Sequence, residues 1–400
     1  MRRLPFPTAF PIFVAMENGS VTSGALNESI RALARRLGFE RIGFCAARKT
    51  PHADFLDNWL GNGWHGTMEW LARTPEWRKD ILSRYDWARS FIMVSIDYRS
   101  ELPQTLPTDS ILHNIARYAR GPDYHHFYKP QLQRLEDEIL HMGGPGTFAL
   151  WYQDTGPFLE RALAAQAGLG WVGKNTMLID SQRGSWTLLA LVVTSLDLAP
   201  DAPVTDHCGT CTRCLDACPT NAFPSPYQLD ASRCISYLTI EHEGTIAPEL
   251  RPAMGKWLYG CDICNEVCPW NSKAPHMAAD DIPDLGGLTV AQILTGKVEH
   301  LMKRIAGTPL QRTGVETLRR NAAIVAGNLK DEKMLPSLEQ ALQTDDDALQ
   351  EAVVWALLQY GTPKARALLA RAQKYVVNEE LRDKIIQELQ GNAPEREPPA

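Results

Sequence analysis

Long apolar runs, an excess of positive charge and widely spread cysteines are all missing from this 400-residue sequence. No stretch approaches the roughly 20 apolar residues of a membrane-spanning helix, so we expect no membrane segment. The net charge of −6 excludes a uniformly basic nucleic-acid-binding protein, and any site for a polyanion must be a local cluster. With 44% hydrophobic residues, the chain is long enough for two or three domains that each bury a core.

An N-terminal export signal is poorly supported as well. Arg2 and Arg3 precede the apolar stretch FPIFVAM, but Pro11 interrupts that stretch and no A-x-A cleavage pattern follows it. We therefore expect residues 1–25 to form a disordered extension, and we expect the protein to be cytoplasmic.

Segments with helical and strand patterns alternate from residue 26 to about residue 200. Apolar spacing predicts helices at 26–37, 127–143 and 156–170, and continuous apolar runs predict buried strands at 41–47, 90–98 and 186–196. In the third helix Pro157 falls in the first turn and Gly168 follows the end. The fold class is therefore multidomain α+β, with an α/β domain over 26–200.

The C-terminal part is predicted to be entirely helical. The segments RNAAIVAGNLKDEKMLPSLEQAL and EAVVWALLQYGTPKARALLARA align at a period of about thirty residues, so that Ala322 matches Ala352 and Ala326 matches Ala356. Small residues at matched helix positions are typical of HEAT-like α-helical repeats. We expect such a domain over 285–390, docked on the preceding domains because two repeats are few, and a disordered tail over 391–400.

Eight of the nine cysteines lie between Cys208 and Cys268, which indicates a site rather than a disulfide framework. The first run has the C-x2-C-x2-C-x3-C-P spacing of bacterial ferredoxins, in which three thiolates bind one [4Fe–4S] cluster and the fourth binds another. The second run lacks one cysteine, which Cys234 supplies. The predicted ligand sets are Cys208, Cys211, Cys214 and Cys268 for one cluster, and Cys218, Cys234, Cys261 and Cys264 for the other.

Two zinc sites with four cysteine ligands each would also use eight thiolates. Zinc ribbons do not require the cysteine triplet or the Cys-Pro endings, so we favour a ferredoxin-like two-cluster domain over 201–275. Such a domain passes single electrons to another module. Cys45 lies in a predicted strand, and we expect a buried structural thiol there.

Six motifs together resemble the epoxyqueuosine reductase family: CGTCTRCLDACPT, ASRCISYLT, YGCDICNEVCPWN, GLGWVGKN, GPDYHHF and MEWLARTPEWRKD. The resemblance runs from about residue 26 to residue 390. It implies a nitroreductase-like cobalamin-binding α/β domain, the two-cluster domain, and HEAT-like repeats that help to grip tRNA. The implied reaction is the reduction of epoxyqueuosine to queuosine and water at the wobble position of tRNA.

The resemblance also implies cofactors, partners and site residues. The cofactors are cob(II)alamin and two [4Fe–4S] clusters, the electrons come from an external donor, and the protein is a monomer. Asp154 in YQDTGP corresponds to the general acid that protonates the departing oxygen. Without the family, Asp154 reads as a turn residue or N-cap before the helix at Pro157. The implied cobalamin contacts are Arg78, Asp154, Leu178, Ser236, Asp262 and Ile263.

Three further positions bear on the cobalt. Ala116 stands where some relatives carry a cysteine, so no thiol is expected there. The D-x-H-x-x-G motif that supplies a histidine ligand in many cobalamin enzymes does not occur. His125 and His126 are adjacent at a predicted helix start, where local hydrogen bonding is the expected role.

A basic island is the expected place for tRNA phosphate contacts. Residues 301–330 hold six basic residues against one acid, Glu316. The basic residues are Lys303, Arg304, Arg312, Arg319, Arg320 and Lys330. Solvated helix charge is the alternative reading for each of them.

Two other functions fit parts of the pattern. A reductive dehalogenase also pairs cobalamin with two clusters, but such proteins usually follow a clear twin-arginine signal and have no HEAT-like tail. A ferredoxin-type electron carrier or a tRNA-binding scaffold without chemistry of its own would not need the α/β domain that precedes the cysteines.

Overall fold

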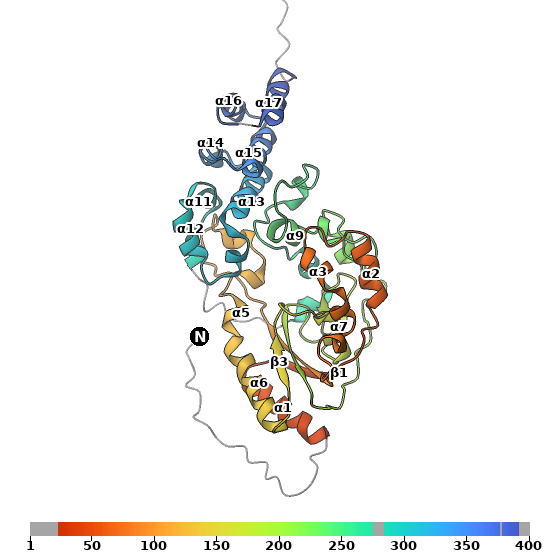
Figure 1. Cartoon of the computed structure of the whole chain (residues 1–400). Coiled ribbons are helices and arrows are strands. Elements are labelled where there is room, and N and C mark those ends of the chain that lie inside the picture. The colour runs from red at the N-terminus through yellow and green to blue at the C-terminus, as the bar shows by residue number, and fades with distance from the viewer. Residues whose placement is uncertain (1–22, 275–283, 377, 392–400) are drawn as a thin grey trace, which may run out of the picture.

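The structure is a computed structural model and describes residues 23–274, 284–376 and 378–391. A sheet flanked by helices forms one end of the molecule, and the C-terminal helices stack at the other end (Figure 1). The first helix, α1 (Ser23–Arg36), begins slightly before residue 26. The rest of the predicted extension, residues 1–22, and the predicted tail beyond Gly391 lie outside the described residues.

The sheet has four strands in the order β1-β2-β6-β3, with every neighbouring pair antiparallel. These strands are β1 (Arg41–Ala46), β2 (Ser90–Asp97), β3 (Ala149–Tyr152) and β6 (Thr187–Thr194). Side chains of β2 alternate between two cores, because successive residues of a strand point to opposite faces. Ile92 and Val94 pack with α1 and α6 (Lys129–Gly143), whereas Phe91 and Met93 pack with α7 (Glu160–Gln166).

Cys45 confirms its expected role as a buried thiol. Its side chain lies in the core on the α7 side of the sheet, and Sγ contacts the carbonyl oxygen of Leu163 at 3.7 Å. Burial raises the pKa of Cys45 to about 12, so the reactive thiolate does not form near neutral pH.

The helix predicted from Pro157 begins later, at Glu160. The residues before it form a loop that buries Phe158 against Phe91, with ring centroids 5.7 Å apart. This contact, together with the unusual backbone of Asp154, replaces the first helical turn that Pro157 had suggested. Gly168 does follow the end of α7 and has a φ of +75°, as a C-terminal glycine should.

Short elements surround the sheet and form the middle of the molecule. Around the sheet lie α2 (Ala53–Gly61), α3 (Glu69–Arg73), α4 (Pro75–Lys79), α5 (Tyr124–Phe127), β4 (Trp171–Val172) and β5 (Leu178–Ile179). The cysteine region contains α8 (Arg213–Asp216), α9 (Ile235–Ile240) and α10 (Ile263–Glu266). None of the helices in the described ranges is long and apolar enough to cross a membrane.

The cysteine region shares its hydrophobic core with the C-terminal helices. Leu238 and Leu258 of this region pack in the same core as α13 (Gly314–Leu329). Ile111 and Leu112, which lie far earlier in the chain, are fully buried in that core too. The middle of the structure is therefore built from three separate parts of the sequence.

The C-terminal helices form the repeat that the sequence predicted. They are α11 (Val290–Thr295), α12 (Val298–Ile305), α13, α14 (Leu335–Ala341), α15 (Asp347–Tyr360), α16 (Pro363–Ala372) and α17 (Glu379–Gly391). The matched alanines of α13 and α15 are buried. At Gly327 the two helices approach so closely that an added Cβ would lie 2.7 Å from Cζ3 of Trp355 and 2.8 Å from Cα of Ala356.

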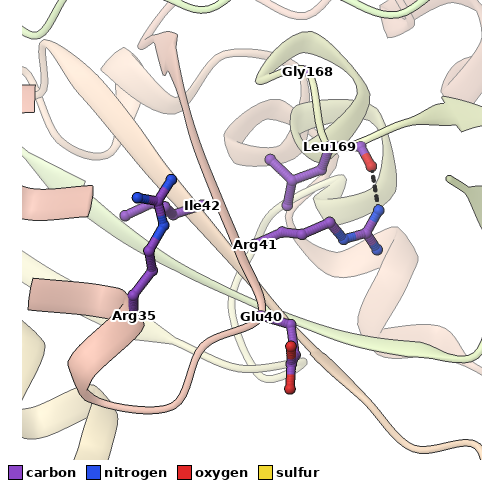
Figure 2. Close-up of a pocket in the computed structure, with 6 residues that line it drawn as sticks. All are labelled: Arg35, Glu40, Arg41, Ile42, Gly168 and Leu169. Carbon is purple, nitrogen blue, oxygen red and sulfur yellow. Dashed lines mark hydrogen bonds between the residues drawn. The ribbon is translucent and has the colours of Figure 1, made fainter. Parts of the chain in front are cut away.

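A cavity of about 190 Å³ lies beside β1 and is lined by charged side chains (Figure 2). Arg41 donates to the carbonyl oxygen of Leu169 at 2.6 Å and forms an ion pair with Asp180 at 2.9 Å. The cavity is lined by Arg35, Glu40, Arg41, Ile42, Gly168 and Leu169. None of the site residues predicted from the sequence lines this cavity, so we assign it no role in the predicted site.

Gly327→Ala should destabilise the protein, because its Cβ forces α13 and α15 apart. Overpacking of this kind typically costs about 1–3 kcal/mol, which exceeds the 0.5–1 kcal/mol or so that alanine gains over glycine in a helix. Denaturant unfolding measures the change. The control is Leu329→Ala in the same helix, where the side chain is 53% exposed and the expected change is within about 0.5 kcal/mol. A Gly327→Ala variant as stable as the unmodified protein would show that the helices can separate freely.

Candidate active site and cluster-binding cysteines

The first predicted ligand set comes together around one cavity. Cys208, Cys211, Cys214 and Cys268 all line a cavity of about 340 Å³, although Cys268 is distant in sequence. Lys174 fixes the loop on one side by donating from Nζ to the carbonyl oxygens of Gly209 at 2.6 Å and Cys211 at 3.0 Å. The predicted fourth ligand, Cys268, thus lies at the same cavity as the other three cysteines of the predicted set.

The second set is grouped as well. Burial, followed by the neighbouring Cys234, raises the pKa of Cys264, and Cys218 acts on Cys264 in the same direction. Cys261 has Cys264 and Cys234 as electrostatic neighbours. The four cysteines left over by the first cavity therefore lie near one another.

The donor chemistry fits iron–sulfur clusters. Each thiolate of a [4Fe–4S] cluster binds a different iron, so the four sulfur atoms surround a cage and do not converge on one ion. Accordingly, no three His, Cys, Asp or Glu side chains in the described ranges are placed to hold a single metal ion. Burial raises the pKa of the Cys214 thiol to about 11 in the protein alone, whereas a bound metal deprotonates a coordinating thiol outright.

Asp154 follows β3 in an unusual backbone conformation. Its φ is +59°, in the left-handed region that aspartate tolerates better than most residues. The Asp154 N–H donates to Oε1 of Glu160 at 2.9 Å, and Oδ2 accepts a hydrogen bond from the Tyr124 hydroxyl at 2.9 Å. The N-cap of α7 is Leu159, so the interpretation of Asp154 as a helix cap is wrong.

Two neighbours of Asp154 were missed in the sequence. Burial and then the charge of Asp154 raise the pKa of Glu160 to about 8. Arg161 donates to the carbonyl oxygen of Thr176 at 2.8 Å, and its charge acts on both Glu160 and Cys234. A Glu-Arg pair at the start of a helix is ordinary in sequence, so no signal distinguished these residues; Tyr124, in contrast, lies within the GPDYHHF motif.

The predicted cobalamin contacts fall in two places. Arg78 on α4 lies at the Asp154 loop, where it donates to the carbonyl oxygen of Gly156 at 3.3 Å. Ser236 on α9 follows Cys234, and Asp262 and Ile263 lie between Cys261 and Cys264. Leu178 is buried on β5, in the core on the α7 side of the sheet.

Unpaired polar atoms lie beside Asp154 and Arg78. Gln153 is only 1% exposed, yet neither of its side-chain amide atoms has a partner within the described part of the chain, and the same holds for Nε of Arg78. The rim of a corrin ring carries amide groups that can both donate and accept hydrogen bonds. The residues present at this loop therefore fit cobalamin.

The other positions weighed for the cobalt are tied into the protein. Ala116 is 1% exposed and packs so closely that a Cβ on Gly260 would lie 2.6 Å from the Cβ of Ala116. His125 contacts Asp123 with its ring nitrogen at 2.9 Å, and His126 lies 3.7 Å from the same carboxylate. The predicted local hydrogen bond is confirmed for His125, whereas His126 lies beyond hydrogen-bond distance of Asp123.

The basic island is only partly available to a polyanion. Arg320 is 2% exposed and donates to the carbonyl oxygens of Leu238 and His242, so the prediction that it contacts phosphate is wrong. Arg319 is partly buried and donates to the carbonyl oxygen of Gly296. The exposed members of the island are Lys303, Arg312 and Lys330.

Family models match three parts of the chain. Residues 78–155 match a model described as epoxyqueuosine reductase QueG, residues 207–271 match a 4Fe-4S double cluster binding domain, and residues 310–390 match HEAT repeats. An epoxyqueuosine reductase of Xanthomonas campestris pv. campestris is 40% identical over 339 residues, which span 83% of this chain and 95% of that protein. The chain belongs to the epoxyqueuosine reductase family.

Other members of the epoxyqueuosine reductase family agree in sequence and in structure. The enzyme of Pseudomonas aeruginosa is 37% identical over 344 residues, which span 84% of this chain and 95% of that protein. A crystal structure of a selenomethionine-labelled epoxyqueuosine reductase superposes with a TM-score of 0.83 at 29% identity and covers 92% of this chain and 99% of that one. A structure of an epoxyqueuosine reductase with an epoxyqueuosine-modified tRNA-Tyr stem loop gives a TM-score of 0.82, with the same identity and coverage.

These matches decide between the classes of function. The protein is an oxidoreductase with a double [4Fe–4S] domain and HEAT repeats, and membership of this family displaces both the dehalogenase and the carrier interpretations.

Cys268→Ala should destroy the cluster assigned to Cys208, Cys211 and Cys214, because it removes the fourth thiolate from their cavity. Iron analysis after anaerobic reconstitution should fall from about eight to about four atoms per chain. Cys45→Ala, which alters a cysteine outside both sets, should keep all the iron. Full iron content in Cys268→Ala would contradict the assignment of the ligands.

Proposed function

We propose that this protein reduces the epoxide of epoxyqueuosine in tRNA to the alkene of queuosine, using cobalamin and two [4Fe–4S] clusters. The observation that carries the proposal is the position of Arg161, whose charge acts on Glu160 beside Asp154 and on Cys234 of the second ligand set. The acidic group beside Asp154 and the second set of cysteines therefore both lie near one region, around the Arg161 side chain.

The side chains that hold the cofactor are those on either side of this region. Gln153, next to Asp154, and Arg78 on α4 offer unpaired polar atoms, and Ser236, Asp262 and Ile263 lie beside cysteines of the second set. Asp262 is fixed by the Arg117 N–H, which donates to Oδ2 at 2.7 Å. When bound there, cobalamin supplies reducing electrons at its cobalt.

Asp154 acts as the general acid in this proposal. The Tyr124 hydroxyl holds one carboxylate oxygen of Asp154 and Glu160 holds its backbone N–H, so both the side chain and the backbone of Asp154 are held in place. Asp154 is nevertheless exposed, which leaves its carboxyl accessible to a substrate. A positioned acid of this kind protonates the oxygen as the carbon–oxygen bond breaks.

Asp154→Asn should reduce turnover of epoxyqueuosine tRNA by about 10²-fold or more, because the amide keeps the size of the side chain but has no proton to transfer. Corrinoid and iron contents should be unchanged, and the clusters should still accept electrons. Turnover close to that of the unmodified enzyme, with both cofactors present, would remove Asp154 from the chemistry.

Phosphate contacts are proposed at the exposed part of the basic island. Arg312 lies near the site, since its charge interacts with Asp154, and it is held over the Trp70 ring at 5.8 Å and paired with Glu241 at 2.9 Å. Lys303 on α12 is exposed nearby in the sequence. These two cations replace Arg319 and Arg320 as the expected tRNA contacts.

The double variant Lys303→Ala/Arg312→Ala should weaken tRNA binding and reduce the slope of log affinity against log salt by about 1 for each phosphate that is no longer neutralised. Titration of labelled tRNA at several salt concentrations measures both quantities. Lys364→Ala serves as the control, because Lys364 is an exposed lysine on α16 that pairs with Glu332 at 2.9 Å. An unchanged slope in the double variant would place the tRNA elsewhere.

The remaining parts of the proposal concern the whole protein. We expect a nitroreductase-like α/β domain, a monomeric and cytoplasmic enzyme, and an external electron donor. Corrinoid and iron analysis of anaerobically purified protein, followed by an assay on epoxyqueuosine tRNA, tests the proposed function directly. Protein that binds no corrinoid and leaves the tRNA unchanged would overturn it.

A further inference from the structure

The proposed reaction needs two protons, whereas the Asp154 carboxyl can deliver only one at a time. Reduction of an epoxide to an alkene takes up two electrons and two protons and releases water. The first proton goes to the oxygen when the first carbon–oxygen bond breaks and a hydroxyl forms. The second proton goes to that hydroxyl when the second bond breaks and water leaves. A single carboxyl must therefore be recharged within the turnover, or a second donor must lie beside it.

Glu160 is the carboxyl placed for this task. The Glu160 carboxyl is buried, and its Oε1 lies 2.9 Å from the backbone nitrogen of Asp154. The side chain of Asp154 is itself exposed. The left-handed backbone of Asp154, with φ at +59°, points the N–H toward Glu160. The loop is also held by Arg78, which donates to the carbonyl oxygen of Gly156.

The charges around Glu160 come from three elements. Asp154 lies on the loop after β3, Arg161 is the next residue of α7, and Arg78 is on α4. Burial and then the negative charge of Asp154 raise the pKa of Glu160 to about 8, against the lowering effects of the Asp154 N–H and of both arginines. Glu160 is therefore mostly protonated at pH 7, as a proton store must be.

We propose that Glu160 is a positioning residue that fixes Asp154 and returns a proton to it between the two carbon–oxygen cleavages. This inference rests on the proposed role of Asp154 as the acid. The transfer runs from the Glu160 carboxyl to the Asp154 carboxylate, directly or through one water, and from Asp154 to the departing oxygen. It is downhill overall, because the departing oxygen is a far stronger base than either carboxylate. We expect a bound anticodon to cover the exposed side of Asp154, which leaves the buried carboxyl of Glu160 as the source of the proton.

Glu160→Gln separates the two roles, because its amide oxygen still accepts the Asp154 N–H while the transferable proton is lost. The single-turnover rate at pH 7 should fall by about tenfold or more, with tRNA affinity unchanged. The rate of the unmodified enzyme should decline as the pH rises through about 8, where Glu160 loses its proton, and this decline should be absent from the variant. A rate and pH profile equal to those of the unmodified enzyme would overturn the proposal.

Glu136→Gln is the matched control. Glu136 on α6 also accepts a backbone N–H, from Trp151 at 2.7 Å. Trp151 is on β3, the strand that precedes Asp154, and burial raises the pKa of Glu136 too. The charged group that acts on Glu136 is Asp137 and not Asp154, so the Glu136 variant should keep both the rate and the pH profile. Glu160→Ala removes the hydrogen bond together with the proton. If Glu160→Ala is slow while Glu160→Gln is normal, the hydrogen bond alone matters and proton return is refuted.

A second measurement needs no turnover. The pKa of Glu160 is raised on folding, so the folded state binds the proton more tightly than the unfolded state between about pH 4.3 and pH 8, and stability falls as pH rises through that window. The Tm of Glu160→Gln should therefore improve relative to that of the unmodified protein from pH 5 to pH 8. A constant difference would show that Glu160 does not store a proton.

Asp154→Asn distinguishes the two failures. If Asp154→Asn is inactive and Glu160→Gln is normal, the role of Glu160 alone is wrong. If Asp154→Asn itself turns over normally, the acid in the proposed function is wrong and proton return through Asp154 falls with it.

Discussion

A buried guanidinium holds the cluster-binding region to the helical repeats. Arg320 on α13 donates to the carbonyl oxygens of Leu238, His242 and Gly244 at 2.7–2.8 Å. Burial lowers its pKa to about 10, so it remains charged at neutral pH. The adjacent Asn321 donates to the carbonyl oxygens of Thr239 and Leu258. These bonds satisfy irregular backbone that would otherwise be buried unpaired. The loops around Cys234 and Cys261 depend on that frame, because they pack against the core that this region shares with the repeats.

Chemistry that demands particular residue types at fixed spacing was readable in the sequence. The cysteine runs and the Cys-Pro endings predicted two groups of four, and the structure gathers the same groups. The apolar runs of β2 and β6 predicted buried strands for a similarly direct reason, since a strand covered on both faces is apolar throughout. The small residues at matched positions of α13 and α15 predicted HEAT-like repeats, and the family model for HEAT repeats matches this part of the chain.

Features that depend on tertiary surroundings were not readable. Six basic residues between 301 and 330 look like a surface patch because a count of charges carries no information about burial. Arg320 can be buried because carbonyl groups distant in sequence accept its hydrogen bonds. The start of α7 was misplaced for the same reason: Pro157 favours a first helical turn, but the burial of Phe158 and the backbone of Asp154 keep the segment open.

The placement of the two carboxyl groups in the proposed proton transfer, Asp154 and Glu160, depends on that open loop. Had the helix begun at Pro157, the Asp154 backbone would have been a cap and Glu160 an ordinary acidic residue of the first turns. With the loop open, the two carboxyl groups become neighbours, and burial and charge act on Glu160 together. The segment that follows Cys234 is built separately and is fixed by α13, and the charge of Arg161 acts on both Glu160 and Cys234.

The burial of Ile111 and Leu112 among the C-terminal helices has a consequence for how the protein is made. A ribosome delivers the chain from its N-terminus, so these side chains emerge long before the helices that cover them. The cysteines of the first run wait in the same way for Cys268, and the segment that follows Cys234 waits for α13. Metal loading is therefore a late event in biogenesis. We expect a nascent chain stalled before residue 314 to expose this apolar surface and its thiols, and so to be recognised by chaperones and proteases.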